Sequence, residues 1–309
     1  MKNETFIKYF YMLPFSGETR SKPFITAFFF LIYVVGVLIN SSIITVICLE
    51  VQLHKPMYLF ICNLSIVDIF YTSVTVPKLL HMLLSRNHIV SSAQCYTQFH
   101  FFFTVAAAED ILLFVMAYDR YVAICNPLHY HRILNQRNCI LITIGIWIGA
   151  FFSALLYVTS VLYMTSCHSN LIHQFFCDIK SLTRISCTGS GIFLIITGID
   201  IFIFGCIPVT CTFISYFKIF YVIFKMKSRE SRRKAFSTCS SHLTVIFIYY
   251  AMSITDYLIP TQSDVLDLIF NTVFSTLIPM TNPIIYSLKN FTVKMAMVRL
   301  INKMFLLTN

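Results

Sequence analysis

The sequence predicts an all-α membrane protein, a bundle of seven transmembrane helices with a short amphipathic helix at its C-terminus. Three observations support this fold class. Hydrophobic residues make up 57% of the 309 residues and charged residues only 12%, about half the charged fraction of a soluble domain. Apolar segments recur that are long enough, at about 20 residues, to cross a bilayer. The 31 Phe and 17 Tyr against only 8 Gly favour helices over the alternating strands of a membrane barrel.

The seven spans follow one another as apolar segments that contain few charged residues. We expect them at about 23–49, 57–84, 95–118, 138–164, 191–217, 235–258 and 266–288. This spacing predicts a single domain over 1–309, with an extracellular N-terminus at 1–22, the bundle at 23–288 and a cytoplasmic tail at 289–309. The opening residues lack the long apolar core and cleavage site of a signal peptide, so the first span is expected to act as its own uncleaved signal.

The distribution of basic residues predicts that the N-terminus lies outside the cell. With that orientation, 15 of the 23 Lys and Arg fall on the cytoplasmic side, where multi-pass proteins concentrate them. Asn3-Glu4-Thr5 is a glycosylation sequon on the outer side, which makes Asn3 a candidate glycosylation site. Because the cytoplasmic loops account for the net charge of +10, we expect no nucleic-acid partner.

The cysteines on the outer side are candidates for disulfide bonds. The chain has 11 cysteines, an odd number, and most lie in spans or on the inner side, where thiols stay reduced. Cys95 opens the third span, and Cys167, Cys177 and Cys187 lie in one outer loop. These four allow two disulfides in any of three connectivities.

Five short motifs at the inner ends of the spans identify a resemblance. They read LHKPMY from Leu53, MAYDRYVAIC from Met116, Ser215-Tyr216, KAFSTCSSHL from Lys234 and PMTNPIIYSLKN from Pro279. In this order and on this side of the membrane, they closely resemble the odorant receptors, a branch of the rhodopsin-like G-protein-coupled receptors. The resemblance covers nearly the whole chain. The sequence departs from the family pattern at Ile39, at Gln174, at Thr281 and at Tyr249-Tyr250-Ala251.

The resemblance implies a receptor without catalytic activity. Such a protein binds a small odorant, activates the olfactory stimulatory heterotrimeric G protein and raises cyclic AMP. Its implied location is the plasma membrane of olfactory neuron cilia, as a multi-pass protein. The resemblance also implies two disulfides, Cys95–Cys177 and Cys167–Cys187. The third inner loop, with seven basic residues, suits either an acidic G-protein surface or anionic membrane lipid. A transporter and an intramembrane enzyme are the alternatives, but neither inverted repeats nor a catalytic motif is visible.

Residues at the inner side are implied to couple the receptor to its G protein. Asp119 can hold Arg120, which sits where the third span meets the cytoplasm. By resemblance, Arg120 contacts the G protein when the sixth helix swings out, and Tyr216 and Tyr286 then steady it. The same set of switch residues includes His242, Asn282 and Pro283, and Pro208 and Pro283 are expected to act as helix hinges. A simple positive-inside anchor is the alternative role for Arg120.

The odorant pocket is expected between the outer halves of helices three, five, six and seven. Helical spacing offers a mostly apolar lining with a few polar groups, as small-molecule sites usually have: Phe102, Phe103, Ala106, Asp200, Phe204, Ser253 and Tyr257. Core packing is the alternative role for each apolar member. Asp200 can contact ligand, stay protonated, or reach Lys180 or Arg184. Phe102 stands where aminergic receptors carry the Asp that binds their amine.

Four polar residues within the spans form a second constellation, namely Asn40, Asp68, Glu109 and Asn282. Acids in a bilayer are costly and usually face a polar interior. Asp68 with Glu109 resembles the sodium-binding pocket of the superfamily, and an oxygen-rich site suits a hard cation. The alternative is a protonated acid pair that shares hydrogen bonds. We expect no other cofactor.

Overall fold

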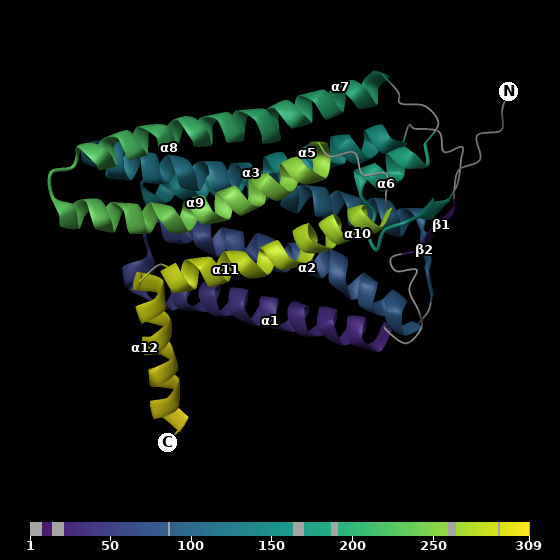
Figure 1. The fold of residues 1–309 in the computed structure, drawn as a ribbon, viewed down its shortest axis with the longest axis horizontal. Helices are drawn as coiled ribbons and strands as arrows, with labels where there is room; N and C mark the ends of the chain where they lie inside the picture. The colour runs from purple at the N-terminus through teal and green to yellow at the C-terminus, as the bar shows by residue number, and fades with distance from the viewer. Residues whose placement is uncertain are drawn as a thin grey trace.

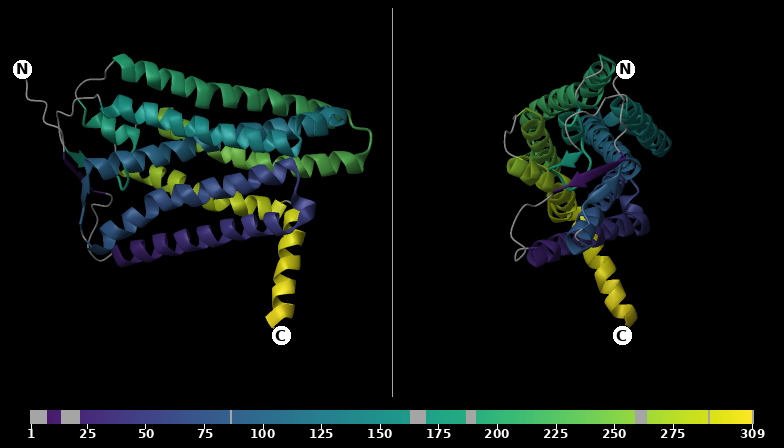
Figure 2. Two further views of the ribbon diagram at one scale, coloured as in Figure 1. Left: turned by 180° about the vertical axis from the view of Figure 1, so that it is seen from behind. Right: turned by 90° about the vertical axis from the view of Figure 1, so that its right-hand side faces the viewer.

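The computed structural model describes residues 8–13, 22–85, 87–162, 170–186, 191–258, 264–289 and 291–308. Long helices run side by side along one axis, with a small sheet at one end of the bundle and the last helix at the other (Figures 1 and 2). We call the end that carries the sheet the outer end and the opposite end the inner end, following the orientation that the sequence predicts. The first four spans are α1 (Lys22–Leu49), α2 (Pro56–Ser85), α3 (Ser92–Cys125) and α5 (Gln136–Leu162).

The remaining spans are less regular. The fifth runs through α7 (Gly191–Asp200), the π-helical turn η3 (Ile201–Cys206) and α8 (Ile207–Lys225). The sixth is α9 (Arg229–Leu258), and the seventh runs through α10 (Asp264–Thr272), the π-helical turn η4 (Val273–Leu277) and α11 (Ile278–Lys289). Pro208 cannot donate a backbone hydrogen bond to the preceding turn, and η3 ends just before it.

Short elements join the spans. They are η1 (Val51–Leu53), η2 (Pro127–His129), α4 (Tyr130–Ile133) and α6 (Ile179–Arg184). The chain ends in α12 (Phe291–Thr308), which leaves the inner end of the bundle at a steep angle (Figure 1). Six helical segments among the described residues are long and apolar enough to cross a membrane, and α9 adds the shorter apolar stretch His242–Thr255. The predicted seven-helix bundle is therefore confirmed, with α9 as the least apolar span.

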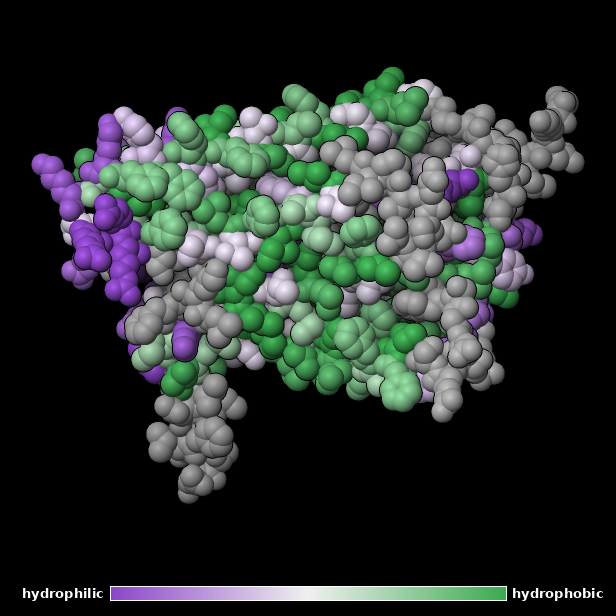
Figure 3. Space-filling model, viewed as in Figure 1, coloured by the Kyte–Doolittle hydropathy of each residue, from purple (hydrophilic) through white to green (hydrophobic). Residues whose placement is uncertain are grey.

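The bundle packs around α3 and shows an apolar surface. α3 contacts α2, α5, α8 and α9, while α1 packs against α2 and α11. Figure 3 shows a hydrophobic surface along the middle of the bundle and hydrophilic side chains gathered at the inner end around the α8–α9 turn. Large apolar side chains such as Phe213 and Phe217 are 70% and 77% exposed. A surface of this size and character is what contact with lipid tails requires.

A three-stranded sheet closes the outer end, which the sequence analysis did not foresee. β1 (Tyr9–Met12) lies between β2 (Ile89–Ser91), with which it pairs antiparallel, and β3 (Leu171–Ile172), with which it pairs parallel. Side chains alternate along β1, as a strand requires: Phe10 and Met12 are buried, while Tyr9 and Tyr11 are exposed. Residues Tyr9–Met12 are therefore part of the fold.

A disulfide joins this outer end to α3. Cys95 is bonded to Cys177, 82 residues apart in sequence, which is one of the two pairs that the resemblance implies. The other pair, Cys167 with Cys187, and the sequon residue Asn3 lie outside the described residues. Ser91 and Gln94 start α3 with a reciprocal capping box, which satisfies backbone donors at the helix start.

Candidate functional site

At the inner end, Asp119 lies between Arg120 and Tyr130. Its carboxylate is fully buried and forms an ion pair with the Arg120 guanidinium, whose Nε donates to Oδ2 at 2.8 Å. The Tyr130 hydroxyl, from α4, donates to the other oxygen, Oδ1, also at 2.8 Å. Burial raises the pKa of Tyr130 and the neighbouring Asp119 carboxylate raises it further, so at neutral pH the phenol keeps the proton that it donates. Both carboxylate oxygens of Asp119 therefore accept a hydrogen bond.

A second inner contact joins the fifth and sixth spans. The Tyr216 hydroxyl, on α8, lies 2.6 Å from Nδ1 of His242 on α9, and both side chains are buried. Nε2 of His242 is buried without a hydrogen-bond partner among the described residues. The implied contact between Tyr216 and Arg120 belongs to a state with the sixth helix swung out, and it stays a prediction. The side chain of Tyr286 lies outside the described residues.

In the middle of the bundle, Asn282 connects the second and third spans. Its Nδ2 donates to Oδ1 of Asp68 at 3.1 Å and faces Oε1 of Glu109 at 3.4 Å. All three side chains are buried, and Oδ2 of Asp68 has no hydrogen-bond partner in the described part of the chain. Asn40 makes its hydrogen bonds elsewhere: its Nδ2 donates to the backbone carbonyls of Gly36 and Pro279. Pro283 is buried inside α11 beside Asn282.

The third-span members of the predicted odorant pocket lie under the outer loop. Phe102 is 4.6 Å from Phe176 and Phe103 is 4.5 Å from Tyr157, measured between ring centroids. Phe176 is fully buried and directly precedes the disulfide residue Cys177. The outer loop therefore reaches down onto the expected pocket, and Phe176 and Tyr157 are neighbours that sequence reasoning missed.

The other predicted pocket residues are spread over three spans. Asp200 accepts a hydrogen bond from the Ser153 hydroxyl of α5 at 3.1 Å, a partner that the sequence analysis did not consider. Ala106 and Phe204 are partly buried and pack against the main hydrophobic core. The Ser253 hydroxyl donates to the Tyr249 carbonyl, one turn earlier in the same helix. The side chain of Tyr257 lies outside the described residues.

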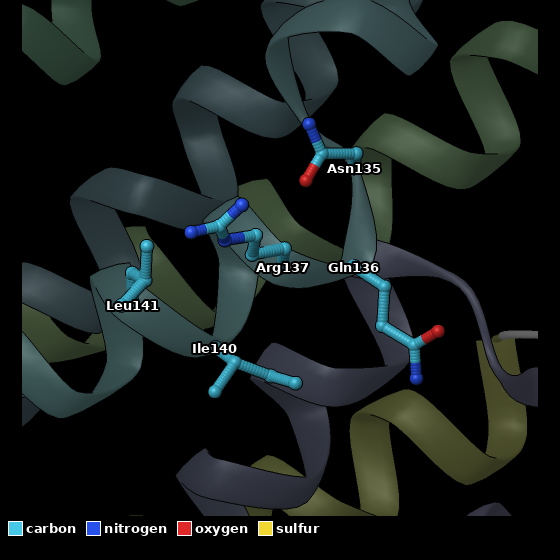
Figure 4. Close-up of a pocket in the computed structure, with 5 residues that line it drawn as sticks. All are labelled: Asn135, Gln136, Arg137, Ile140 and Leu141. Carbon is cyan, nitrogen blue, oxygen red and sulfur yellow. The ribbon is translucent and has the colours of Figure 1, made fainter.

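Two surface depressions lie elsewhere. One, of about 560 Å³, is at the start of α5, where Asn135, Gln136 and Arg137 are followed one turn later by Ile140 and Leu141 (Figure 4). The other, of about 400 Å³, is an apolar cleft between α1 and the seventh span, lined by Phe24, Ile25, Phe28, Phe29, Ile269, Thr272 and Val273. The predicted pocket residues line neither depression. No group of three or more His, Cys, Asp or Glu side chains arranged to hold a metal ion occurs in the described ranges.

Comparisons with known proteins agree with the motifs. A family model described as Olfactory receptor matches residues 29–304. Olfactory receptor 1G1 of the gorilla (Gorilla gorilla gorilla) is 39% identical over 305 residues, which cover 97% of this chain and 96% of the relative. Human Olfactory receptor 12D3 and mouse Olfactory receptor 5B21 are each 37% identical, over 98% and 99% of this chain and 97% and 96% of their own lengths. A match of this extent, on a multi-pass bundle with these inner-end motifs, shows that the chain belongs to the olfactory receptor family and is not an enzyme.

Proposed function

We propose that this chain binds a small odorant among the outer halves of helices three, five, six and seven and activates the olfactory stimulatory G protein, which raises cyclic AMP. Its place of action is then the plasma membrane of olfactory neuron cilia. The observation that carries this proposal is the inner-end network of Asp119, Arg120 and Tyr130, together with the Tyr216–His242 contact. The network and the contact both lie at the inner end of the bundle, where the basic third inner loop is found.

The network explains how odorant binding would be transmitted. In the structure Arg120 is bound to Asp119, and α9 is tied to α8 through His242. Outward movement of α9 requires the Tyr216–His242 contact to change. A ligand that fits the open arrangement better shifts the population toward it, by no more than its difference in affinity for the two states. The receptor thus does no chemistry and acts as a two-state switch.

Replacement of Arg120 tests this function. Arg120→Ala is expected to abolish odorant-evoked cyclic AMP while the receptor still reaches the cell surface. Arg299→Ala is the matched control, because Arg299 lies on α12 with half its side chain exposed. Cells with a cyclic AMP reporter and a surface-labelling assay give both readouts. Full signalling by Arg120→Ala at equal surface level would overturn the proposal.

A sodium ion is proposed as a modulator in the middle of the bundle. Asp68 and Glu109 supply carboxylate oxygens, Asn282 bridges them, and the unpaired Oδ2 of Asp68 offers a ligand position. Oxygen donors of this kind suit a hard cation. Replacing external sodium by choline is expected to change odorant potency in the wild type and to have no effect on Asp68→Asn. Identical sodium dependence in both proteins would instead favour a proton shared by the two acids.

The depression at the start of α5 is proposed to contact membrane lipid. Arg137 stands at the predicted cytoplasmic surface, and Ile140 and Leu141 follow it at 43% and 57% exposure. A cation above an apolar wall matches a lipid headgroup above its acyl chains. Arg137→Ala is expected to reduce retention of anionic lipid by the purified receptor, measured by mass spectrometry of bound lipid. Unchanged retention would refute this contact.

A further inference from the structure

Asp110 is an intramembrane acid to which the sequence analysis gave no role. It follows Glu109 on α3, but it faces the sixth span: Tyr249 is in hydrogen-bond contact with its carboxyl group. Asp200, in the fifth span, is close enough to act on it electrostatically. Asp110 also retains partial exposure, whereas Glu109 is buried. Two carboxyl groups from different spans therefore lie within electrostatic range of each other, and Asp200 also accepts its hydrogen bond from Ser153.

Two hydroxyl groups beside Asp110 lack partners. Tyr250 on α9 is 8% exposed and Thr212 on α8 is 3% exposed. Their oxygens neighbour each other, yet neither makes a hydrogen bond of acceptable geometry among the described residues. The Asp110 carboxyl acts electrostatically on the Tyr250 hydroxyl, so the acid lies near this pair of hydroxyl groups. Buried polar groups are normally satisfied, and two adjacent exceptions next to a carboxyl group indicate a place for a ligand.

The surrounding spans supply no cation for these acids. Residues 92–119, 191–217 and 235–258 contain neither Lys nor Arg. Besides Asp119, which pairs with Arg120, four acids lie in the same stretches, namely Glu109, Asp110, Asp200 and Asp256. Carboxylates within a membrane usually pair with a positive charge. The positive charge that would pair with these carboxylates must therefore come from a group outside the chain.

We propose that Asp110 and Asp200 bind the protonated amino group of a small organic amine, with the Tyr250 and Thr212 hydroxyls as additional partners. This inference rests on the proposed function, since it names the class of odorant for that pocket. An ammonium group donates three hydrogen bonds and accepts none, which matches a carboxylate flanked by two hydroxyl oxygens. Asp110 lies eight residues, roughly 12 Å along the helix axis, inward of Phe102, so the amine would sit deeper than in aminergic receptors.

The wall above Asp110 suits the alkyl part of such a ligand. Phe103, Ala106 and Asp110 are spaced by three and four residues, so they share one face of α3. All three are partly exposed, whereas Ala107 and Ala108 between them are buried. An apolar stripe that ends in a carboxyl group fits an aliphatic chain that ends in an amine. In this arrangement Asp110 forms the polar inner end of the pocket predicted from sequence.

Thermal stabilisation of the receptor in lipid nanodiscs tests this inference without a G protein. The probes are pentylamine and 1,5-diaminopentane, with pentan-1-ol as the uncharged comparison. We expect the amines to raise the melting temperature of the wild type at concentrations where pentan-1-ol does not. Asp110→Asn is expected to weaken the amine midpoint at least tenfold, and Asp200→Asn severalfold. Glu50→Gln, an acid at the inner end near Arg299, is the matched control and should leave the midpoint unchanged.

Each outcome decides the proposal. Equal stabilisation by amines and pentan-1-ol, or the same amine midpoint in wild type and Asp110→Asn, would overturn it. If Asp110→Asn does not fold, Tyr250→Phe replaces it: this variant keeps the acid and should bind the amine severalfold more weakly, and an unchanged midpoint would again overturn the inference. Cyclic AMP responses are measured in parallel. Responses to uncharged odorants without amine binding would refute the amine site alone, whereas amine binding without any response would refute the proposed signalling alone.

Discussion

Removal of the Tyr130 hydroxyl is expected to raise signalling in the absence of odorant. In the structure this hydroxyl donates to Asp119 at 2.8 Å, and Asp119 is fully buried with Arg120 on its other oxygen. In Tyr130→Phe, one carboxylate oxygen loses its donor and the ion pair that holds Arg120 is weakened. The resting arrangement is then destabilised relative to any state in which Arg120 has left Asp119.

The size of the effect follows from the type of bond. A hydrogen bond to a charged group contributes about 1.5–3 kcal/mol. Tyr130 begins the short helix α4 and is only partly buried, so the lower value applies. A change of about 1.4 kcal/mol is a tenfold change in an equilibrium constant. A receptor with roughly 1% of its molecules in the active state would therefore rise to roughly 10%.

The assay is basal cyclic AMP at matched surface expression. Tyr118→Phe is the control, since its hydroxyl makes no hydrogen bond among the described residues and it lies one residue from Asp119. Tyr130→Phe should exceed both wild type and Tyr118→Phe severalfold. Basal cyclic AMP at or below the wild-type level, with equal surface labelling, would show that the Tyr130 contact does not hold the resting state.

Two further predictions concern the outer end. The disulfide closes a segment of 82 residues, for which loop-closure entropy predicts about 4.5 kcal/mol of stabilisation. Cys95→Ser should therefore lower the melting temperature in detergent strongly, Cys177→Ser should lower it equally, and the double variant should lower it no further. Additive losses in the double variant would contradict the bond. Phe10 is 1% exposed, so Phe10→Ala should cost about 3–5 kcal/mol, measured as the fall in melting temperature. Tyr9→Ala, at a position 55% exposed, should cost less than about 0.5 kcal/mol, and equal losses at the two positions would show that β1 does not pack as a strand.

The helices were predictable because lipid imposes a simple requirement. Every apolar stretch of about 20 residues must satisfy its backbone internally and so forms a helix. The expected span 57–84 is α2 at Pro56–Ser85, and 266–288 matches α10 through α11. The π-helical turns η3 and η4 were not predictable, because one extra residue in a turn leaves the hydrophobic pattern almost unchanged.

The site was predictable only where a motif stands in consecutive residues. The ion pair of Asp119 with Arg120 joins neighbours in sequence, but Tyr130 is 11 residues away on another element, and nothing in its surrounding residues marks the contact. The Tyr216–His242 contact spans two helices and depends on their packing. Asp110 was visible as an acid in a span, yet only the structure places it beside Tyr249. The strand Tyr9–Met12 has only four residues, and the residues around it show no regular alternation of apolar and polar side chains. The sequence alone therefore does not distinguish it from an unstructured N-terminus.

The position of β1 between β2 and β3 sets the order in which the protein can be completed during synthesis. β1 leaves the ribosome first, yet one neighbour follows the second span and the other follows the fourth. The N-terminal residues must therefore wait, already translocated, until more than half of the chain has been made. Pairing between segments this distant in sequence is slow, and during the delay the edge of β1 and the Phe10 side chain are available to chaperones of the secretory pathway. Closure of this sheet then depends on how quickly β1 meets β3, and substitution of the buried Phe10 or Met12 side chain would slow it without touching the Asp119–Arg120 ion pair at the other end of the bundle.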